Sequence, residues 1–278
     1  MFNIKIIIVL LVTGSVAACN GLTREPAKSA GQEEEVIVSG PENINYYVVN
    51  RFAHDTTAFT EGLLIHEGNL YESTGSPDNL PHTRSLIGVV DLQTGAIDKK
   101  AELDRNKYFG EGITFLHNKL YQLTYQTKVG FIYDARTFKQ IDTFPLPVQE
   151  GWGMTTDGTH LILSDGSSNL TYLDTLTLKP VKTLSVKENN VAVDNVNELE
   201  YINGFIYANV YTTSNIIKID PSNGRVVGKI DLSTLVAEAT NRYPGSLEMN
   251  GIAYDSTSKK IYVTGKLWPH IYEISFPH

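Results

Sequence analysis

The sequence predicts an all-β fold, a five-bladed β-propeller, because strand and turn signals alternate along it with a regular period. From residue 44 onward, short apolar or aromatic runs are separated by turn residues, which is typical of many short strands. Five short segments rich in glycine, acidic and amide side chains, which we call starts because each begins a repeat unit, recur about every 40 to 55 residues. This spacing is the period of one four-stranded propeller blade. The starts lie at residues 61–62, 111–112, 151–153, 197–200 and 250–251.

Each start leads into strand-like runs, which lie at residues 69–71, 119–121, 160–163, 205–207 and 260–263. Turns with an Asp or Arg follow at residues 90–95, 133–136, 173–175 and 219–224. The fifth unit is short, so we expect Tyr46 to Val49 to supply its outer strand and close the ring, which hides the sheet edges. One stretch, from Asp231 to Ala239, is predicted to be helical. A β-sandwich with irregular repeats is the alternative fold.

The first 18 residues are predicted to be a signal peptide. The apolar run from Ile6 to Val12 is short of the roughly 20 residues of a transmembrane helix. The small residues before Cys19 resemble a bacterial lipobox, which implies a lipoprotein signal peptide over residues 1–18 and lipid on Cys19. The alternative is an ordinary signal peptide that ends in cysteine. Residues 19–43 are predicted to be a flexible tether, followed by the propeller domain over residues 44–278.

This N-terminus leads us to expect a protein of the bacterial cell envelope, anchored by lipid at Cys19 to the membrane, with the outer membrane favoured. The formal net charge of −8 argues against a nucleic-acid partner. Cys19 is the single cysteine, so no intrachain disulfide is expected. The seven histidines show no metal-ligand spacing, and neither a metal nor another cofactor is expected. We expect a monomer.

One carboxylate, Glu111, lies between Gly110 and Gly112 at the second start. Because glycine removes side-chain bulk, we expect another molecule to approach the backbone closely there. A lone acid in such a place can act as a general acid/base if its surroundings tune its pKa. The alternative is a structural acid that caps backbone amides. A similar sequence pattern, an aromatic residue followed closely by an acid and a glycine, recurs around Glu61 at the first start. In a propeller these starts converge on one rim, where we expect Glu61, Glu111, Trp152, Asn197 and Lys266.

Eight short motifs, taken together and in order, resemble the plant and bacterial type of glutaminyl-peptide cyclotransferase, the glutamine cyclotransferase family. They lie at residues 59–63, 71–75, 109–112, 150–153, 164–167, 197–201, 250–255 and 264–266. The resemblance runs from about residue 46 to residue 274 and implies a five-bladed propeller. It further implies an enzyme that converts the N-terminal glutamine of peptide or protein substrates to pyroglutamate and releases ammonia.

The resemblance also implies roles for the polar rim residues. Glu111 takes the position of the acid that accepts a proton from the attacking amine and returns one to the departing ammonia. Asn197 and Lys266 take positions suited to stabilising the oxyanion of the tetrahedral intermediate. Glu61 lies where the plant form has glutamine, and a second carboxylate near Glu111 is expected to raise the pKa of one of the two.

An aromatic pocket that folds the substrate back on itself is the other implied feature. Trp152, Phe59 and Phe109 match family positions, whereas Tyr125 and Tyr211 stand where tryptophan is common. Their hydroxyls make a more polar pocket.

Each of these residues also has a structural alternative. The alternatives are core positions for Trp152, Tyr125 and Tyr211, a rim-organising hydrogen-bonding role for Glu61, an Asx turn for Asn197, and a plain salt bridge to Glu61 or Glu111 for Lys266. Glu198 and Glu200 are expected to be structural.

Two other functions stay open. The tyrosine replacements motivate a propeller lipoprotein that binds a partner without turnover. A metal-dependent propeller hydrolase is the second, with Glu61, Glu111 and Asn197 as part of a metal cage.

Overall fold

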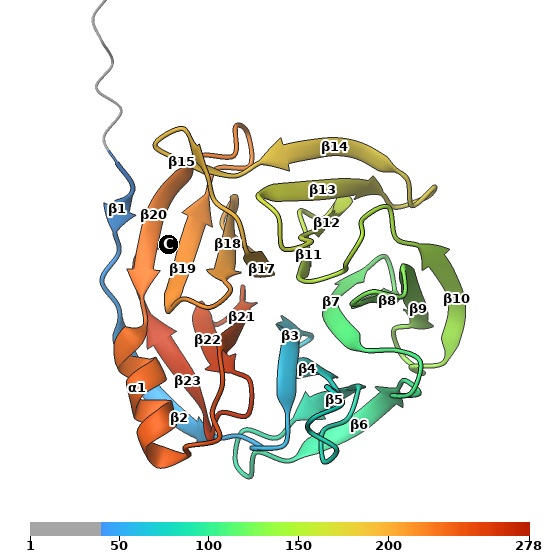
Figure 1. Cartoon of the computed structure of the whole chain (residues 1–278), viewed down its shortest axis with the longest axis horizontal. Helices are drawn as coiled ribbons and strands as arrows, with labels where there is room; N and C mark the ends of the chain where they lie inside the picture. Colours follow the sequence, from blue (N-terminus) through green and yellow to red (C-terminus); the bar gives the residue numbers. More distant parts are fainter. Residues whose placement is uncertain (1–39) are drawn as a thin grey trace, which may run out of the picture. The chain divides into compact units, whose positions relative to one another are not determined.

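The structure, a computed structural model, describes residues 40–278. Five sheets surround a central axis, which confirms the predicted five-bladed propeller (Figure 1). The predicted signal peptide, Cys19 and the tether as far as residue 39 lie outside the described residues. Within residues 40–278, no helix has both the length and the apolar character needed to span a membrane.

The first four blades each run outward from an innermost strand through three antiparallel neighbours. Blade 1 contains β3 (Phe59–His66), β4 (Asn69–Gly75), β5 (Leu86–Val90) and β6 (Ile97–Glu102). Blade 2 contains β7 (Gly110–Leu116), β8 (Lys119–Thr124), β9 (Val129–Asp134) and β10 (Gln140–Pro145). Blade 3 contains β11 (Met154–Thr156), β12 (His160–Leu163), β13 (Asn169–Asp174) and β14 (Pro180–Ser185). Blade 4 contains β17 (Val196–Ile202), β18 (Phe205–Val210), β19 (Asn215–Ile219) and β20 (Val226–Asp231).

The fifth blade joins the two ends of the propeller. It consists of β21 (Met249–Asp255), β22 (Lys260–Gly265), β23 (His270–Ser275) and, outermost, β2 (Tyr47–Ala53). β2 is antiparallel to β23, in a register that runs from Tyr47 opposite Ser275 to Ala53 opposite His270. The prediction that the leading segment closes the ring is therefore confirmed.

Three elements lie outside the regular blades. β1 (Glu42–Asn43) pairs in parallel with β20, so the last residues of the segment predicted as tether contact blade 4. β15 (Lys187–Glu188) and β16 (Val191–Ala192) form a short hairpin before β17. The predicted helix is α1 (Ser233–Arg242), which begins and ends two to three residues later than expected.

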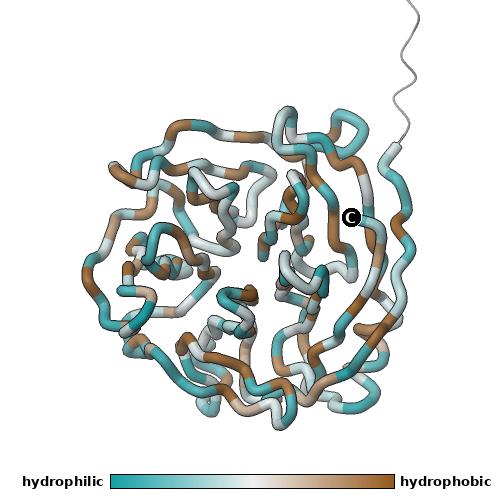
Figure 2. Tube along the Cα trace, turned by 180° about the vertical axis from the view of Figure 1, so that it is seen from behind, coloured by the Kyte–Doolittle hydropathy of each residue, from teal (hydrophilic) through white to brown (hydrophobic). Residues whose placement is uncertain are grey.

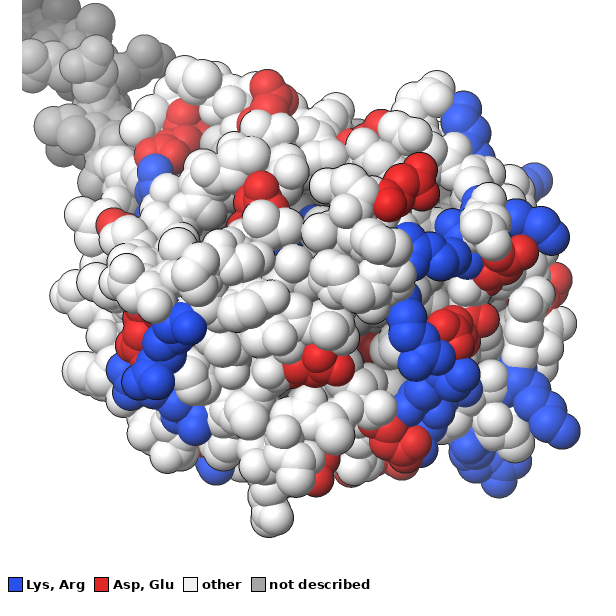
Figure 3. All heavy atoms as spheres, turned by 60° about the horizontal axis from the view of Figure 1, so that its bottom comes forward, with Lys and Arg blue, Asp and Glu red and all other residues white. Residues whose placement is uncertain are grey.

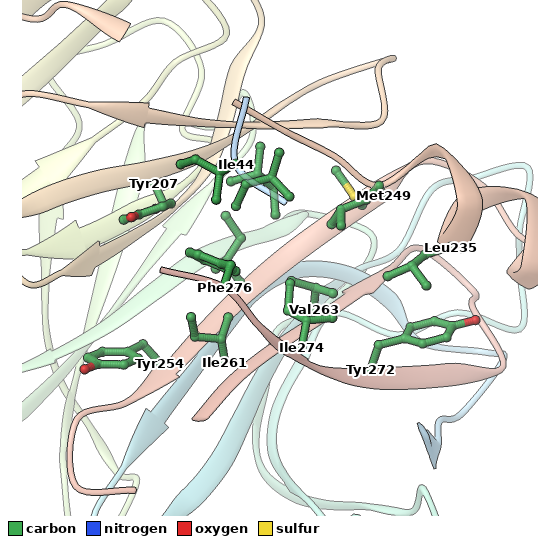
Figure 4. Packing of buried hydrophobic residues seen from close by; sticks show 14 of the residues in the cluster. Ile44, Tyr207, Leu235, Met249, Tyr254, Ile261, Val263, Tyr272, Ile274 and Phe276 are labelled. Carbon is green, nitrogen blue, oxygen red and sulfur yellow. The ribbon is translucent and has the colours of Figure 1, made fainter. Parts of the chain in front are cut away.

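The hydrophobic core is divided among the five contacts between neighbouring blades. Several inner and middle strands, such as β8 and β12, are buried over most of their length, whereas the outer strands β10 and β14 are mostly exposed. Figure 2 shows hydrophobic residues distributed through all five blades. The largest cluster lies between blades 4 and 5, where Leu235 of α1 and Ile44 pack with Ile261, Val263 and Ile274 (Figure 4). On the face seen in Figure 3, Lys and Arg side chains lie interspersed with Asp and Glu.

Candidate active site

β-bulges at the beginning of four inner strands carry Glu61, Glu111, Asn197 and Asn250, whereas Lys266 directly follows β22. The pairing of β3 with β4 skips Glu61, and the pairing of β7 with β8 skips Glu111. The pairings of β17 and β21 skip Asn197 and Asn250 in the same way. A bulge bends the strand and re-aims the side chain of the unpaired residue. The repeated bulge therefore explains how residues from four blades reach one rim.

The glycines around Glu111 have a different role from the one expected. A Cβ on Gly112 would lie 2.5 Å from the backbone nitrogen of Met154, and one on Gly110 would lie 2.9 Å from the backbone oxygen of Thr74. The backbones of the neighbouring blades occupy that space. The prediction that a second molecule approaches these glycines is therefore wrong, because the strands themselves pack too closely there.

All nine predicted pocket residues line one cavity, with a volume of about 180 Å³. They are Phe59, Glu61, Phe109, Glu111, Tyr125, Trp152, Asn197, Tyr211 and Lys266. The cavity is small compared with the roughly 300–1,000 Å³ of sites for drug-sized ligands. It therefore suits one side chain of a substrate rather than a long segment.

The floor of the cavity holds a buried charged cluster. The Lys266 ammonium donates to Glu61 Oε1 at 2.7 Å, and Asn250 Nδ2 donates to Glu61 Oε2 at 3.1 Å. The Glu111 carboxyl lies in the same cavity, close enough for the Glu61 charge to raise its pKa. Two carboxyls and one ammonium thus share a site from which water is largely excluded.

Burial raises the pKa of both carboxyls, and the Glu61 charge adds to this effect on Glu111. Burial raises the pKa of Glu61 to about 7, although Lys266 partly offsets the effect. Burial and then the Glu61 charge raise the pKa of Glu111 well above its usual range. Burial lowers the pKa of Lys266, but the two carboxylates outweigh burial and raise it overall. This agrees with the expectation that a second carboxylate near Glu111 raises the pKa of one of the two.

Aromatic rings form the walls of the cavity. Phe109 makes an edge contact with Phe59 at 6.0 Å between ring centroids and lies 5.8 Å from Tyr125. Trp152 and Tyr211 meet edge to face at 5.5 Å. The Lys266 ammonium lies 4.5 Å from the centre of the Phe59 ring. These contacts fix the rings at low entropic cost and keep a cation against aromatic faces.

The Asn197 side chain is buried in the wall and has no hydrogen-bond partner among residues 40–278; its Oδ1 is one of the buried polar atoms left unsatisfied. Its backbone oxygen is held by Ser164 Oγ at 2.7 Å. Buried polar groups are normally hydrogen-bonded. A fixed backbone with a free side-chain amide is therefore suited to a ligand.

Glu150 is a rim residue that the sequence reasoning missed. Its carboxylate accepts from Trp152 Nε1 at 3.0 Å and from Gln126 Nε2 at 2.8 Å. After burial, the Glu150 charge is the next cause that raises the pKa of Tyr125. Glu150 therefore holds the Trp152 wall of the pocket in place. Its position directly before the Gly-Trp-Gly start was the available signal. Asn250, which holds Glu61, was missed as well, although it begins the fifth start.

A second layer of polar side chains lies behind the pocket. His54 Nε2 lies 3.1 Å from both oxygens of Glu72, and Thr60 Oγ1 donates to Glu72 at 2.7 Å. His54 Nδ1 bonds the Trp268 backbone oxygen at 2.8 Å. This pair links the strand that carries Glu61 to the turn that follows Lys266.

Glu198 and Glu200 have the structural contacts that were expected of them. The Glu198 carboxylate accepts from the backbone nitrogens of Leu63 and Ile252, and Glu200 accepts from Tyr254. Each therefore joins β17 to the inner strand of another blade.

The metal-dependent alternative uses Glu61, Glu111 and Asn197 as part of a metal cage. Within residues 40–278, no three His, Cys, Asp or Glu side chains gather in a way that could hold a metal ion. Glu61 is already bonded to an ammonium, whose charge opposes a metal cation beside it.

Comparisons with known proteins agree with this geometry. Residues 15–276 match the family described as glutamine cyclotransferase. The chain is 40% identical over 253 residues to the glutaminyl-peptide cyclotransferase of Arabidopsis thaliana, covering 90% of this chain and 77% of that protein. The crystal structure of Myxococcus xanthus glutaminyl cyclase superposes with a TM-score of 0.76 and 31% identity, covering 85% of this chain and 98% of the other. This chain therefore belongs to the glutamine cyclotransferase family.

Proposed function

We propose that this protein is a glutaminyl-peptide cyclotransferase that converts the N-terminal glutamine of peptides to pyroglutamate, with Glu111 as the general acid/base. The observation that carries the proposal is the buried Glu111 carboxyl in an aromatic cavity beside a free amide and an ammonium. A raised pKa suits a group that must take and return a proton near neutral pH.

The reaction needs no group beyond those in the pocket. The glutamine side chain enters between the aromatic walls, and its neutral α-amine attacks the side-chain amide carbon. As the new N–C bond forms, the amine proton passes to the Glu111 carboxylate. Glu111 then protonates the amide nitrogen, the old C–N bond breaks, and ammonia leaves. The five-membered lactam that remains is pyroglutamate, so atoms and charge balance.

Asn197 and Lys266 stabilise the charge that develops on the amide oxygen. Within residues 40–278, Asn197 is held through its backbone oxygen, and its Nδ2 donor makes no hydrogen bond that would compete with the substrate. The ammonium of Lys266 has three N–H donors, of which one bonds Glu61. Donors fixed before the reaction stabilise an oxyanion without reorganisation, and removing one typically costs about 10²–10³-fold in rate. We expect Asn197→Ala to lower kcat by that factor.

A direct assay tests the proposal. The purified protein is incubated with a glutamine-initiated dipeptide, and ammonia and pyroglutamyl product are measured with and without a chelator. The proposal predicts equimolar ammonia and product, unchanged by the chelator. Binding of the dipeptide without product would support a non-catalytic binding protein, and chelator-sensitive turnover would support metal chemistry.

We further propose that the protein acts as a monomer in the bacterial envelope, anchored by lipid at Cys19 to the outer membrane. The sequence of the first 19 residues supports the envelope location and the anchor. Mass spectrometry of the protein from its native host tests the anchor: lipid on Cys19 that is lost in Cys19→Ser is expected, and an unmodified cysteine would contradict it. Light scattering of the protein tests the monomer.

A further inference from the structure

A second hollow lies on the rim beside the Tyr211 wall of the pocket. It has a volume of about 410 Å³ and is lined by Thr212, Val236 of α1, Leu247 and Glu248, among others. Two backbone hydrogen bonds of 2.9 Å tie it to the pocket: Leu247 N donates to Lys266 O, and Lys266 N donates to Glu248 O. Tyr211 directly precedes Thr212. Lining residues of the hollow and of the pocket are therefore adjacent in the chain or joined by backbone hydrogen bonds.

The hollow, which we call the rim groove, combines an apolar side with one charge. The Leu247 side chain is 40% exposed, and Val236 is partly buried against the core. Among residues 40–278, no hydrogen bond or ion pair involves the Glu248 carboxylate. Its charge nevertheless reaches the pocket: after burial, Glu248 is the main cause that raises the pKa of Tyr211. The groove thus offers an unpartnered carboxylate close to the site.

The other acid near the pocket mouth is already engaged. Glu150 accepts hydrogen bonds from Trp152 and Gln126 through its two oxygens. These two hydrogen bonds hold the Trp152 wall of the pocket in place. Glu248 is therefore the rim acid that is free to receive a cationic group.

The cavity holds about one side chain, so the rest of a peptide substrate has to lie outside it. If the first residue fills the cavity, the next Cα lies about 3.8 Å along the chain, at the rim. We propose that the rim groove binds the side chain of the second residue and favours lysine or arginine there. The methylene stem lies along Leu247 and Val236, while the charged head approaches Glu248. This inference rests on the proposed cyclase function.

Pairs of dipeptide amides test the groove. For the unsubstituted protein, kcat/KM for glutaminyl-lysine amide is expected to exceed that for glutaminyl-glutamate amide by about three- to fivefold, the size of an exposed ion pair. In Glu248→Gln that ratio is expected to fall toward one. Because the ratio is taken within one variant, any general effect on catalysis cancels. Glu150→Gln is the matched control and is expected to keep the preference.

Leu247→Ser tests the apolar side separately. It is expected to reduce the preference for glutaminyl-norleucine amide over glutaminyl-alanine amide, because the exposed Leu247 side chain no longer covers the stem. A lysine preference that persists in Glu248→Gln, or that disappears in Glu150→Gln instead, would overturn the proposed groove. No ammonia from glutamine amide itself would instead overturn the cyclase function, and the groove with it.

Discussion

Glu61 and Glu111 are two buried carboxyls that compete for one ammonium, and this competition sets the pH at which the site can work. Lys266 contacts Glu61 directly at 2.7 Å. Glu111 has no such ion pair among the described residues. Glu111 therefore keeps its proton to higher pH, as burial and the Glu61 charge both require. Since the carboxylate form accepts the amine proton, activity should rise with pH through the raised pKa of Glu111.

Glu61→Gln should shift this rise to lower pH. The change removes the neighbouring negative charge, which lowers the pKa of Glu111 and gives more carboxylate at a given pH. The measurement is the pH profile of kcat/KM. Glu188→Gln, which removes a surface charge paired with Lys229, is the matched control and should leave the profile unchanged. If the rising limb of the pH profile does not move in Glu61→Gln, the pKa of Glu111 does not depend on the Glu61 charge.

At the scale of elements, the inner strands must pack closely enough to bring the bulged residues together. Gly153 is the tightest example, because a Cβ there would overlap the backbone oxygen of Asn197. Gly158, by contrast, has open space at its Cβ but a φ of +86°. Substituting alanine at each position therefore distinguishes the cost of close packing, at Gly153, from the cost of backbone strain, at Gly158.

Gly153→Ala should lower both stability and activity. Overpacking of this kind costs about 1–3 kcal/mol, and the displaced Asn197 should lower kcat. Gly158→Ala should lower stability through strain while leaving kcat/KM unchanged. Urea unfolding and the ammonia assay measure the two effects. Full activity in Gly153→Ala would mean that Asn197 needs no fixed position.

The His54–Glu72 pair joins blade 1 to blade 5, and both side chains are fully buried. Burial lowers the pKa of His54, but the Glu72 charge and hydrogen bonds outweigh burial and raise it overall. The stabilisation by the pair is therefore fully present below the unfolded pKa of about 6.5 and is lost as pH rises through the folded pKa.

Glu72→Ala should cost about 3–5 kcal/mol of unfolding free energy at low pH, because it leaves a buried charge unpaired. The loss should be smaller at alkaline pH, where His54 is neutral. Glu102→Ala, which breaks an exposed pair with Arg84, is the control and should cost about 1 kcal/mol or less. Equal losses in the two variants would show that the buried pair does not hold the blades together.

At the scale of the whole molecule, one strand from the N-terminal side closes the ring. β2 covers the edge of β23, and Asn50 Nδ2 donates to Glu273 at 2.7 Å across that contact. Arg51 adds a 2.8 Å ion pair with Glu238 of α1. Without β2, the last blade would expose an unpaired sheet edge.

A chain that begins at residue 54 should therefore lose the cooperative fold and aggregate. A chain that begins at residue 40 keeps β2 and should behave as a compact protein. Size-exclusion chromatography and thermal unfolding of the two chains measure the difference. A compact, cooperatively folded chain from residue 54 would contradict the closure.

The propeller was predictable because it depends on repetition along the chain, and the aromatic pocket residues were predictable from the resemblance to the family. Glu111 lies in one of the recurring starts, and the resemblance to the family predicted that Asn197 and Lys266 act beside it. Glu150 and Asn250 were missed because their roles depend on which side chains face them across blades. β1 was missed because two polar residues, Glu42 and Asn43, carry no strand periodicity. The glycines beside Glu111 were misinterpreted because spacing between blades is set by packing.

The most direct measurement of the central claim is single-turnover cyclisation of a glutamine-initiated peptide by Glu111→Gln beside the unsubstituted protein. The amide keeps the size of the side chain but cannot take the amine proton. Pyroglutamate formation is expected to fall by about 10²–10⁴-fold while the peptide still binds. Cyclisation at an unchanged rate in Glu111→Gln would contradict the central claim.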